Sequence, residues 1–375
     1  MRIDFHPSPE PTIGVEWELA LVDRDGRDLA PTAAELFERV TPHLDDADRL
    51  HPELLRNTIE VVTGVCDTVG DAVAQQRGTL EVILSVCDDL GVDLYGAGTH
   101  PFASWQGQEL TPDHRYVELI QRTQWWGRQL LIWGVHVHVG LPERDRVLPV
   151  LAGMLPYAPH LQALSASSPL WAGVDTGYAS NRALMFQQLP TAGLPYQFEQ
   201  WQQYESFAHD QLTTGAIPDL GQIHWDIRPS PKLGTLETRV CDGVSTIHEL
   251  GALAALVQCL VVDLDSRIAA GETVTTLPPW HVVENKWRAA RYGLDADVIV
   301  DRECRDRPVT DDLAELLPRL APTAERLGCS AELAAVTDIV RDGASYQRQR
   351  TVAEGSGDLV AVVEAVVREL RESLT

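Results

Sequence analysis

The chain has 375 residues, of which 44% are hydrophobic and 23% are charged, a composition typical of globular proteins rather than of disordered, collagen-like or coiled-coil chains. The 55 acidic and 30 basic side chains leave a net charge of −25, which disfavours binding to nucleic acid or to an anionic membrane surface. The N-terminus has no apolar signal segment, and no run of about 18 apolar residues is apparent, so the sequence predicts a cytoplasmic protein without a membrane span.

The first 140 residues carry four strand patterns. Residues 12–22 alternate, with Glu16 and Glu18 on one face and Val15, Trp17 and Leu19 on the other. Further strands are predicted at residues 57–63, 92–98 and 131–140, and the last places His136 and His138 on one face. Helices are predicted at residues 32–40, 69–90 and 113–130, and Gly91 is expected to end the second.

The second half of the chain is richer in helices. A helix at residues 143–164 is expected to be disturbed by Pro149 and Pro156, and a loop-rich segment follows at 165–195. Strands at 221–229 and 234–242 form a predicted antiparallel hairpin, and the remaining helices are expected at 196–211, 246–270, 279–292 and beyond about residue 311. These elements predict an α+β fold, one antiparallel sheet with helices on its outer face, in a single domain spanning 1–375.

The six cysteines form no CxxC pair. In a cytoplasmic chain of this length they are most simply reduced core residues.

Five of the predicted strands carry polar side chains on one face and apolar side chains on the other. If they share one sheet, its polar face holds four glutamates, two histidines and two arginines: Glu16, Glu18, Glu60, Glu237, His136, His138, Arg228 and Arg239. Glu53 lies just upstream of Glu60, while His224 and Asp226 are expected beside Arg228.

The polar side chains of any one strand have a simpler explanation, either as a hydrogen-bonded pair of core histidines or as a salt bridge between strands. Together they favour Mg²⁺ or Mn²⁺ beside an anionic substrate, the equipment of phosphoryl transfer. The sequence contains no Walker, GxGxxG, GxSxG or HExxH motif.

Six segments in this order resemble one family. They are GVEWEL at 14–19, the acidic pair Glu53 and Glu60, GVHVHVG at 134–140, the stretch 168–195, HWDIRPSPKLGTLETRVCD at 224–242 and ENKWRAARYGL at 284–294. The sequence is similar to carboxylate–amine ligases of the glutamate–cysteine ligase type 2 group (YbdK-like proteins), within the glutamine synthetase and guanido kinase fold superfamily. The resemblance runs from about residue 13 to about residue 350.

The resemblance implies a curved antiparallel sheet whose concave face is the active site. It implies that ATP and the acid substrate enter from opposite ends, with two or three Mg²⁺ ions between them. The implied reaction is phosphorylation of a carboxylate, glutamate in the related ligases, followed by attack of the cysteine amine on the acyl phosphate. A homodimer is a further expectation, from the resemblance and from the frequency of two-fold assemblies.

Roles follow from the resemblance position by position. Glu237 and His136 match metal ligands, as do Glu16, Glu18, Glu53 and Glu60, and His138 is expected nearer the nucleotide phosphates. Arg239 matches the residue that stabilises the transferring phosphoryl group. Arg182 and Arg228 are candidates for holding the substrate carboxylates or the acyl phosphate, in an order left open, so Arg239, Arg228 and Glu237 form the expected catalytic set. Glu284, Asn285 and Arg288 share a helix face that is either a substrate contact or a solvated surface.

Three alternatives remain open at this level. The acid and amine can differ from glutamate and cysteine, because no motif locates either amino-acid pocket. A metal-dependent amide hydrolase is a second reading, since HVHVG also resembles the HxH of parallel amidohydrolase barrels. A non-catalytic protein on a ligase fold is the third, although the intact set of acids and arginines counts against it.

Overall fold

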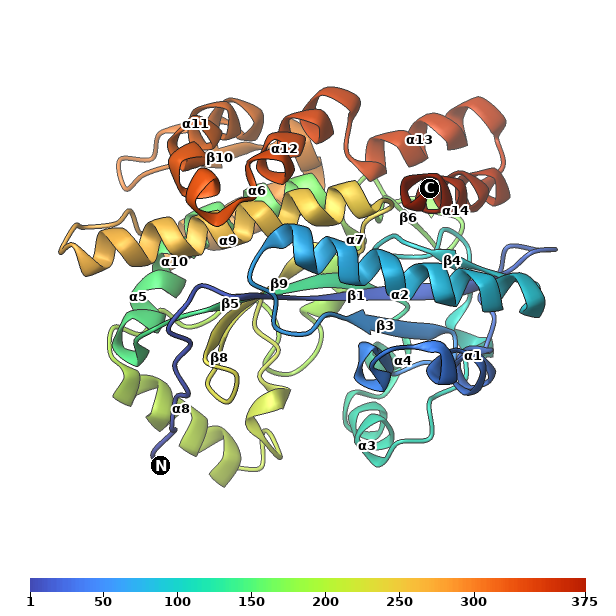
Figure 1. Ribbon diagram of the computed structural model, residues 1–375, viewed down its shortest axis with the longest axis horizontal. Coiled ribbons are helices and arrows are strands. Elements are labelled where there is room, and N and C mark those ends of the chain that lie inside the picture. Colours follow the sequence, from blue (N-terminus) through green and yellow to red (C-terminus); the bar gives the residue numbers. More distant parts are fainter.

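The computed structural model describes all residues 1–375 and is built around one seven-stranded antiparallel sheet (Figure 1). The strand order is β2-β3-β1-β5-β9-β8, and β4 pairs with the far end of β1. The strands of this sheet are β1 (Ile13–Asp23), β2 (Leu50–Pro52), β3 (Thr58–Val62), β4 (Val92–Tyr95), β5 (Gly134–Gly140), β8 (Ile227–Ser230) and β9 (Thr235–Asp242). The predicted α+β fold with an antiparallel sheet is therefore confirmed, and a parallel barrel is excluded.

Strand β1 organises the sheet because it pairs with three other strands. Its residues from Ile13 to Trp17 pair with β5, those from Ala20 to Asp23 pair with β4, and β3 pairs along its middle. Trp17 and Leu19 are fully buried in the core on one face of the sheet, whereas Glu16 and Glu18 lie half-buried on the other face. The period-two pattern of the sequence thus sets which face is the core.

Two long helices cover the apolar face of the sheet, α2 (Val69–Leu90) and α9 (Ile247–Ala269), which lie above it in Figure 1. Helix α2 ends at Gly91, which adopts a left-handed conformation with φ 70°. Helix α9 is long and apolar enough to span a membrane, with a mean hydropathy of 1.7, so the expectation that no such segment exists is wrong. The core explains its composition, because 83% of that apolar window is buried inside the fold.

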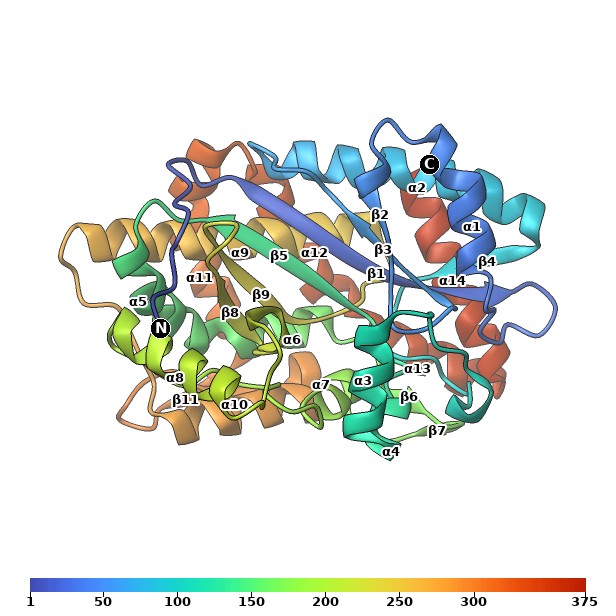
Figure 2. The same cartoon turned by 90° about the horizontal axis from the view of Figure 1, so that it is seen from below.

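The remaining helices flank the sheet or form an outer layer. Below the sheet in Figure 1 lie α3 (His114–Thr123), α4 (Trp125–Arg128) and α8 (Trp201–Thr213), and Figure 2 shows these helices in front of the strands. The others are α1 (Ala33–Val40), α5 (Arg144–Met154), α6 (Ala158–Ser165), α7 (Asn181–Phe186), α10 (Pro279–Tyr292), α11 (Val309–Leu327), α12 (Ser330–Asp342), α13 (Ser345–Ser356) and α14 (Leu359–Leu374). Two small sheets pair β6 (Leu170–Trp171) with β7 (Val174–Asp175) and β10 (Asp297–Ile299) with β11 (Asp306–Pro308).

Several predicted elements are interrupted. The helix expected at 113–130 is split between α3 and α4 at Gln124, whose φ of 53° is incompatible with a helix. The helix expected at 143–164 breaks into α5, a 3₁₀ turn at Leu155–Tyr157 and α6, because Pro156 lies at the junction. The loop expected at 165–195 contains the short helix α7, and the helix expected at 196–211 begins only at Trp201.

The pairing of β5 with β9 contains a β-bulge. Val135 pairs with Cys241 and Val137 pairs with Thr238, so Arg239 and Val240 together oppose the single residue His136. Such bulges bend a strand and redirect its side chains, and they are frequent beside active sites.

Candidate active site

Cross-strand pairing brings the predicted acids and histidines together on the sheet face opposite α2 and α9. Glu16 pairs with His136, Glu18 with Glu60, His138 with Glu237, and Glu237 with Arg228. Residues paired across strands project to the same side of a sheet. The prediction that these five strands share one polar face is therefore confirmed.

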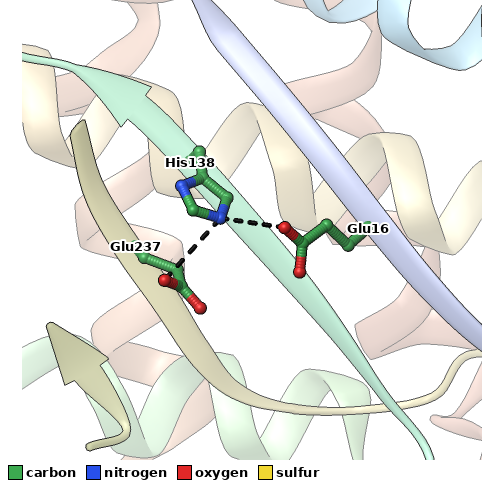
Figure 3. Close-up of side chains that lie close together, drawn as sticks. All are labelled: Glu16, His138 and Glu237. Atoms are coloured by element: carbon green, nitrogen blue, oxygen red, sulfur yellow. Dashed lines mark hydrogen bonds and ion pairs between the residues drawn. The ribbon is translucent and has the colours of Figure 1, made fainter. Parts of the chain in front are cut away.

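Carboxylate and imidazole atoms on this face form three overlapping groups. Within each group the ligand atoms lie within 4.8 Å of one another, and the groups are Glu16–His138–Glu237, Glu16–Glu60–His136 and Glu18–Glu53–Glu60. Figure 3 shows the first group, with side chains from β1, β5 and β9 converging. All six residues predicted as metal ligands belong to this set, and His138 joins them. Glu53 reaches it from the segment after β2, where its carboxylate accepts a hydrogen bond from the Leu54 N–H at 3.1 Å.

The two histidines have different partners. His136 Nδ1 lies 2.8 Å from Glu16 Oε2, whereas its Nε2 is buried without a hydrogen-bond partner, 3.7 Å from Glu18 Oε1. His138 Nε2 lies 3.1 Å from Glu16 Oε1 and 3.7 Å from Glu237 Oε2, and its Nδ1 lies 2.9 Å from Thr235 Oγ1. His136 therefore keeps one ring nitrogen for a ligand, while both nitrogens of His138 are engaged.

Burial and mutual repulsion separate the acids into two kinds. Burial, reinforced by the charge of Glu18, raises the pKa of Glu53 to about 8, and burial with the charges of Glu16 and Glu53 raises the pKa of Glu60 well above its usual value. Burial also opposes ionisation of Glu16, but hydrogen bonds from His136 and His138 bring its pKa well below the usual value. Glu53 and Glu60 therefore need a cation beside them to carry full charge at neutral pH.

The donor set fits a hard divalent cation. Carboxylate oxygens dominate it, and one buried imidazole nitrogen is unpartnered. Of the five carboxylates only Glu237 pairs with arginines, whereas the other four have no positive group at ion-pair distance except the histidines. Mg²⁺ and Mn²⁺ are the cations that oxygen-rich sites of this type select, and imidazole favours tolerance of Mn²⁺.

Three predicted arginines surround these acids. Arg239 Nη1 donates to Glu237 and lies 3.3 Å from His136 Nδ1, and its buried Nε has no partner. Arg228 Nε donates to Glu237 Oε2 at 2.7 Å, and its Nη1 donates to the carbonyls of Gly221 and Ile223, both at 2.7 Å. Burial alone would raise the pKa of Glu237, but the charges of Arg239, His138 and Arg228 hold it far below its usual value.

Two cavities open on opposite sides of the acidic groups. The first, here called the arginine cavity, has a volume of about 340 Å³ and is lined by Arg182, Arg228 and Arg239, by Glu18, Glu53, Glu60 and His136, and by Arg115 and Tyr116 of α3. The second, here called the N-terminal cavity, has a volume of about 650 Å³ and is lined by residues 7–9 and 12–16, by residues 62–65, and by Glu60, His138 and Leu233. Glu60 lines both, so the acids lie between two separate spaces.

Some residues lie elsewhere than the sequence indicated. Strand β8 begins only at Ile227, because Asp226 N–H donates to Gly193 O at 2.7 Å and draws the preceding segment off the sheet. Asp226 is therefore buried in an ion pair with Lys286 (Nζ to Oδ2, 2.5 Å) rather than on the polar face, whereas His224 lines the arginine cavity.

On α10, Arg288 Nε donates to Glu284 Oε1 at 2.8 Å, and the Asn285 side chain bonds Ile299 N and O. These contacts favour a structural role for that helix face. Arg115 and Tyr116, in contrast, escaped prediction, since a polar side chain on an amphipathic helix gives no sign that tertiary packing turns it into a cavity.

Five of the six cysteines are buried and none is in a disulfide, as predicted; the exception is Cys304, which is exposed.

Comparison with known proteins places this geometry in a family. A relative from Nocardioides sp., provisionally named glutamate–cysteine ligase 2-3, is 68% identical over 375 residues and is covered completely, as is this chain. A Mycobacterium tuberculosis relative, provisionally named glutamate–cysteine ligase 2, is 60% identical over 370 residues, which cover 98% of this chain and 97% of the relative.

The fold also matches solved structures. A glutamate–cysteine ligase from Francisella tularensis in complex with AMP matches with a TM-score of 0.70 at 13% identity, over 99% of this chain and 91% of that one. A bifunctional glutathione synthetase from Pasteurella multocida matches with a TM-score of 0.67 at 14% identity, over 97% of this chain and 53% of that one. At these identities the likeness establishes the fold.

A sequence model of glutamate–cysteine ligase family 2 matches residues 12–365, nearly the whole chain. The protein belongs to glutamate–cysteine ligase family 2.

Proposed function

We propose that the protein is an ATP-dependent carboxylate–amine ligase that joins the γ-carboxylate of glutamate to the amine of cysteine and releases ADP and phosphate. The observation that carries the proposal is the group of acids and histidines lying between two cavities, with arginines on one side. The names of the relatives support the reaction type and the substrate pair. The AMP in the Francisella ligase supports an adenine nucleotide as one substrate.

The lining of each cavity suggests its occupant. The arginine cavity suits the acid substrate, because Arg182, Arg228 and Arg239 supply the positive charge that carboxylates require. The N-terminal cavity suits the nucleotide, because it is the larger of the two and Val62, Val65 and Leu233 offer apolar side chains for a base. His138 lies on the side of this second cavity, as expected for a residue near the nucleotide phosphates.

The residues that would hold divalent cations are Glu16, Glu18, Glu53, Glu60, His136 and Glu237. Two or three Mg²⁺ or Mn²⁺ ions bound there would neutralise the carboxylates together with the phosphates of ATP and so supply the electrostatic stabilisation that phosphoryl transfer requires.

The three arginines divide the remaining work. Arg239 keeps a buried Nε without a partner beside Glu237, so its permanent charge is available to the phosphoryl group as that group moves. Arg228 is committed to Glu237 and to two backbone carbonyls, so we assign it to holding Glu237 in place. Arg182 keeps free donors in the arginine cavity and binds the α-carboxylate of glutamate, the carboxylate that does not react.

The reaction proceeds in two displacements. A γ-carboxylate oxygen of glutamate bonds to the γ-phosphorus of ATP while the bond from that phosphorus to the bridging oxygen of ADP breaks. The cysteine nitrogen then bonds to the acyl carbon, the bond from that carbon to the phosphate oxygen breaks, and the amine loses its proton. Reduced cysteine and ATP coexist in the cytoplasm, where we place the reaction, and the six unpaired cysteines fit that compartment.

The proposal is tested by ADP release with Mg²⁺ in the presence of glutamate alone, cysteine alone, both, and a panel of other acids and amines. We expect ADP only with an acid and an amine together, and a product with the mass of γ-glutamylcysteine. ADP with a different pair would keep the ligase mechanism and change its substrates. ATP binding without ADP from any pair would favour a non-catalytic protein, and amide cleavage without ATP would contradict the ligase.

A further inference from the structure

Arg182 has an unusual environment for a buried guanidinium. Arg182 is only 2% exposed, and no carboxylate lies within ion-pair distance of its guanidinium. Its Nη1 donates to the backbone carbonyl of Arg239 at 3.2 Å, its Nε has no partner, and its guanidinium lies 5.3 Å above the Phe186 ring. The side chain lines the arginine cavity. The charge of Arg182 acts on the pKa of the buried Asp242 carboxyl without forming an ion pair with it, so the unused donors can bind an anion supplied by a ligand in the cavity.

Two serines hold the backbone that carries this side chain. Helix α7 has six residues, too few to be stable alone. Ser180 caps it by accepting a hydrogen bond from Ala183 N–H at 3.1 Å, and Ser168 Oγ accepts one from Arg182 N–H itself at 3.1 Å. The direction of the Arg182 side chain therefore depends on where these two hydroxyls lie.

Both hydroxyls donate to one carboxylate. Ser180 Oγ donates to Asp242 Oδ1 at 2.8 Å, and Ser168 Oγ donates to Asp242 Oδ2 at 2.6 Å. Asp242 is fully buried, and a third donor, the Ser167 N–H, lies 3.1 Å from Oδ2. The carboxylate is thus satisfied by donors from the segment that leads to α7, and it has no ion-pair partner.

The position of Asp242 is itself fixed by close packing. A Cβ atom added to Gly98 would lie 2.7 Å from Asp242 Cγ, so the carboxylate fills the space that this glycine leaves open. A Cβ atom added to Gly134 would likewise lie 2.1 Å from a terminal nitrogen of Arg182, in the space that the guanidinium occupies. Asp242 is the last residue of β9, the strand that also carries Glu237 and Arg239. One strand therefore bears two side chains of the candidate active site and the carboxylate that holds α7 in place.

We propose that Asp242, acting through Ser168 and Ser180, is a positioning residue that fixes Arg182 in the arginine cavity and thereby sets the affinity for the non-reacting carboxylate of the acid substrate. The part concerning the substrate rests on the proposed ligase function, whereas the part concerning the position of Arg182 stands on the structure alone.

The kinetic test compares S168A and S180A with a matched capping variant, T68A. Thr68 caps α2 in the same way, by accepting from Asp71 N–H at 3.1 Å, but α2 lies on the other face of the sheet. We expect S168A and S180A to raise KM for glutamate about tenfold, with kcat changed by less than about threefold, because an Arg182 that is displaced weakens ground-state binding. The KM for ATP is expected to stay unchanged, T68A is expected to lose thermal stability only, and S180T is expected to restore KM.

Two further measurements separate positioning from general loss of structure. In the R182A background, S180A is expected to cause no additional change in KM, since the residue through which it acts is gone. In crystal structures of S180A and S168A, the Arg182 guanidinium is expected to leave its place over Gly134, a readout that needs no turnover.

Unchanged KM with a lowered Tm, a full additional effect of S180A in R182A, or an unmoved guanidinium would each overturn the proposal. Absence of turnover in the wild type would refute the ligase function and leave the crystallographic result to decide the position of Arg182. D242N is a third variant, and if it fails to fold the two serine variants carry the test.

Discussion

At the scale of single residues, Glu237 is the centre of the site. It is 1% exposed, its two oxygens contact Arg228 and Arg239, and His138 lies 3.7 Å away. Removing its charge leaves two arginines without their shared partner and removes one ligand from the acidic groups.

We therefore expect E237Q to lower kcat at least about 100-fold, a loss comparable to removal of one electrostatic group from an active site. The fold is expected to survive, because Glu16 and Glu18 still offset the charge of Arg239. The measurement is ADP release together with circular dichroism. E35Q is the matched control, since Glu35 lies exposed on α1 in a single pair with Arg39 at 2.5 Å. Full activity in E237Q would contradict the assignment of the site.

Glu53 gives a second residue-scale prediction, on pH. Its pKa is about 8 in the folded state and about 4.3 in the unfolded state. Because the folded protein binds this proton more tightly, the proton stabilises the fold, and its full contribution is present below about pH 4.3. This stability is lost as pH rises through about 8. In EDTA, E53Q should therefore exceed the wild type in Tm by about 3 °C or more at pH 8.5, and the difference should vanish near pH 4.5. Saturating Mg²⁺ should reverse the order at pH 8.5. If the wild type were more stable than E53Q in EDTA at pH 8.5, the Glu53 carboxylate would not be destabilised by burial and by its neighbouring charges.

At the scale of elements, the strands were predictable and the connections were not. The alternation in β1, β3, β5 and β9 predicts both the strands and the face of each side chain, because burial on one face leaves a period of two in the sequence. Helix α7 could not be predicted, since its stability comes from Asp242, which is distant in sequence. The start of β8 at Ile227 and the break at Gln124 likewise depend on tertiary contacts.

The same distinction applies to the site. Residues on strands were found because strand geometry fixes which of them share a face. Arg115 and Tyr116 were missed, because the packing of α3 against the sheet leaves no local signal.

The attachment of α14 gives an element-scale prediction. Asp93 on β4 is buried and accepts hydrogen bonds from Arg27 at 2.5 Å, from Arg371 of α14 at 2.7 Å and from Arg24 at 3.1 Å. Burial alone would raise the pKa of Asp93, but these three arginines bring it below its usual value. The resulting stability is present above about pH 4 and is lost as pH falls through the lowered pKa.

D93N is expected to lower Tm by about 5 °C or more at pH 7, because it leaves three arginines around an uncharged group. The difference from the wild type should shrink as pH falls below about 4, and KM values should not change. Thermal melts across pH provide the measurement, and D89N is the control because Asp89 on α2 is exposed and forms no ion pair. An equal loss of stability in D93N and D89N would contradict the attachment.

At the scale of the whole molecule, much of the chemistry depends on how a chain of net charge −25 tolerates carboxylates placed side by side. Composition alone could not separate the acids of the site from those on the surface. The fold separates them, because the sheet gathers Glu16, Glu18, Glu60 and Glu237 while most other acids stay exposed.

Mg²⁺ is therefore expected to raise Tm, and to raise it more at pH 8 than at pH 5.5. Protons held by Glu53 and Glu60 at the lower pH compete with the cation, since both carboxyl groups have raised pKa values. Melts with Mg²⁺ and with NaCl at matched ionic strength separate site binding from charge screening. An equal gain from both salts would argue against a specific cation site.

The β-bulge in β9 determines which face of the sheet the last residues of this strand point to. In an unbroken strand, residues three apart point to opposite faces, so Arg239 and Asp242 could not both serve the site. The bulge places one extra residue opposite His136, which shifts the alternation of faces by one position. Cys241 therefore pairs with Val135 on the core face, and Asp242 pairs with Gly134 on the same face as Arg239. One inserted position thus lets a single strand place Glu237, Arg239 and Asp242 on the same face of the sheet. Deletion of one residue from the bulge would turn the Asp242 side chain from the polar face into the core. At this point in the chain, the number of residues therefore matters more than their chemical type.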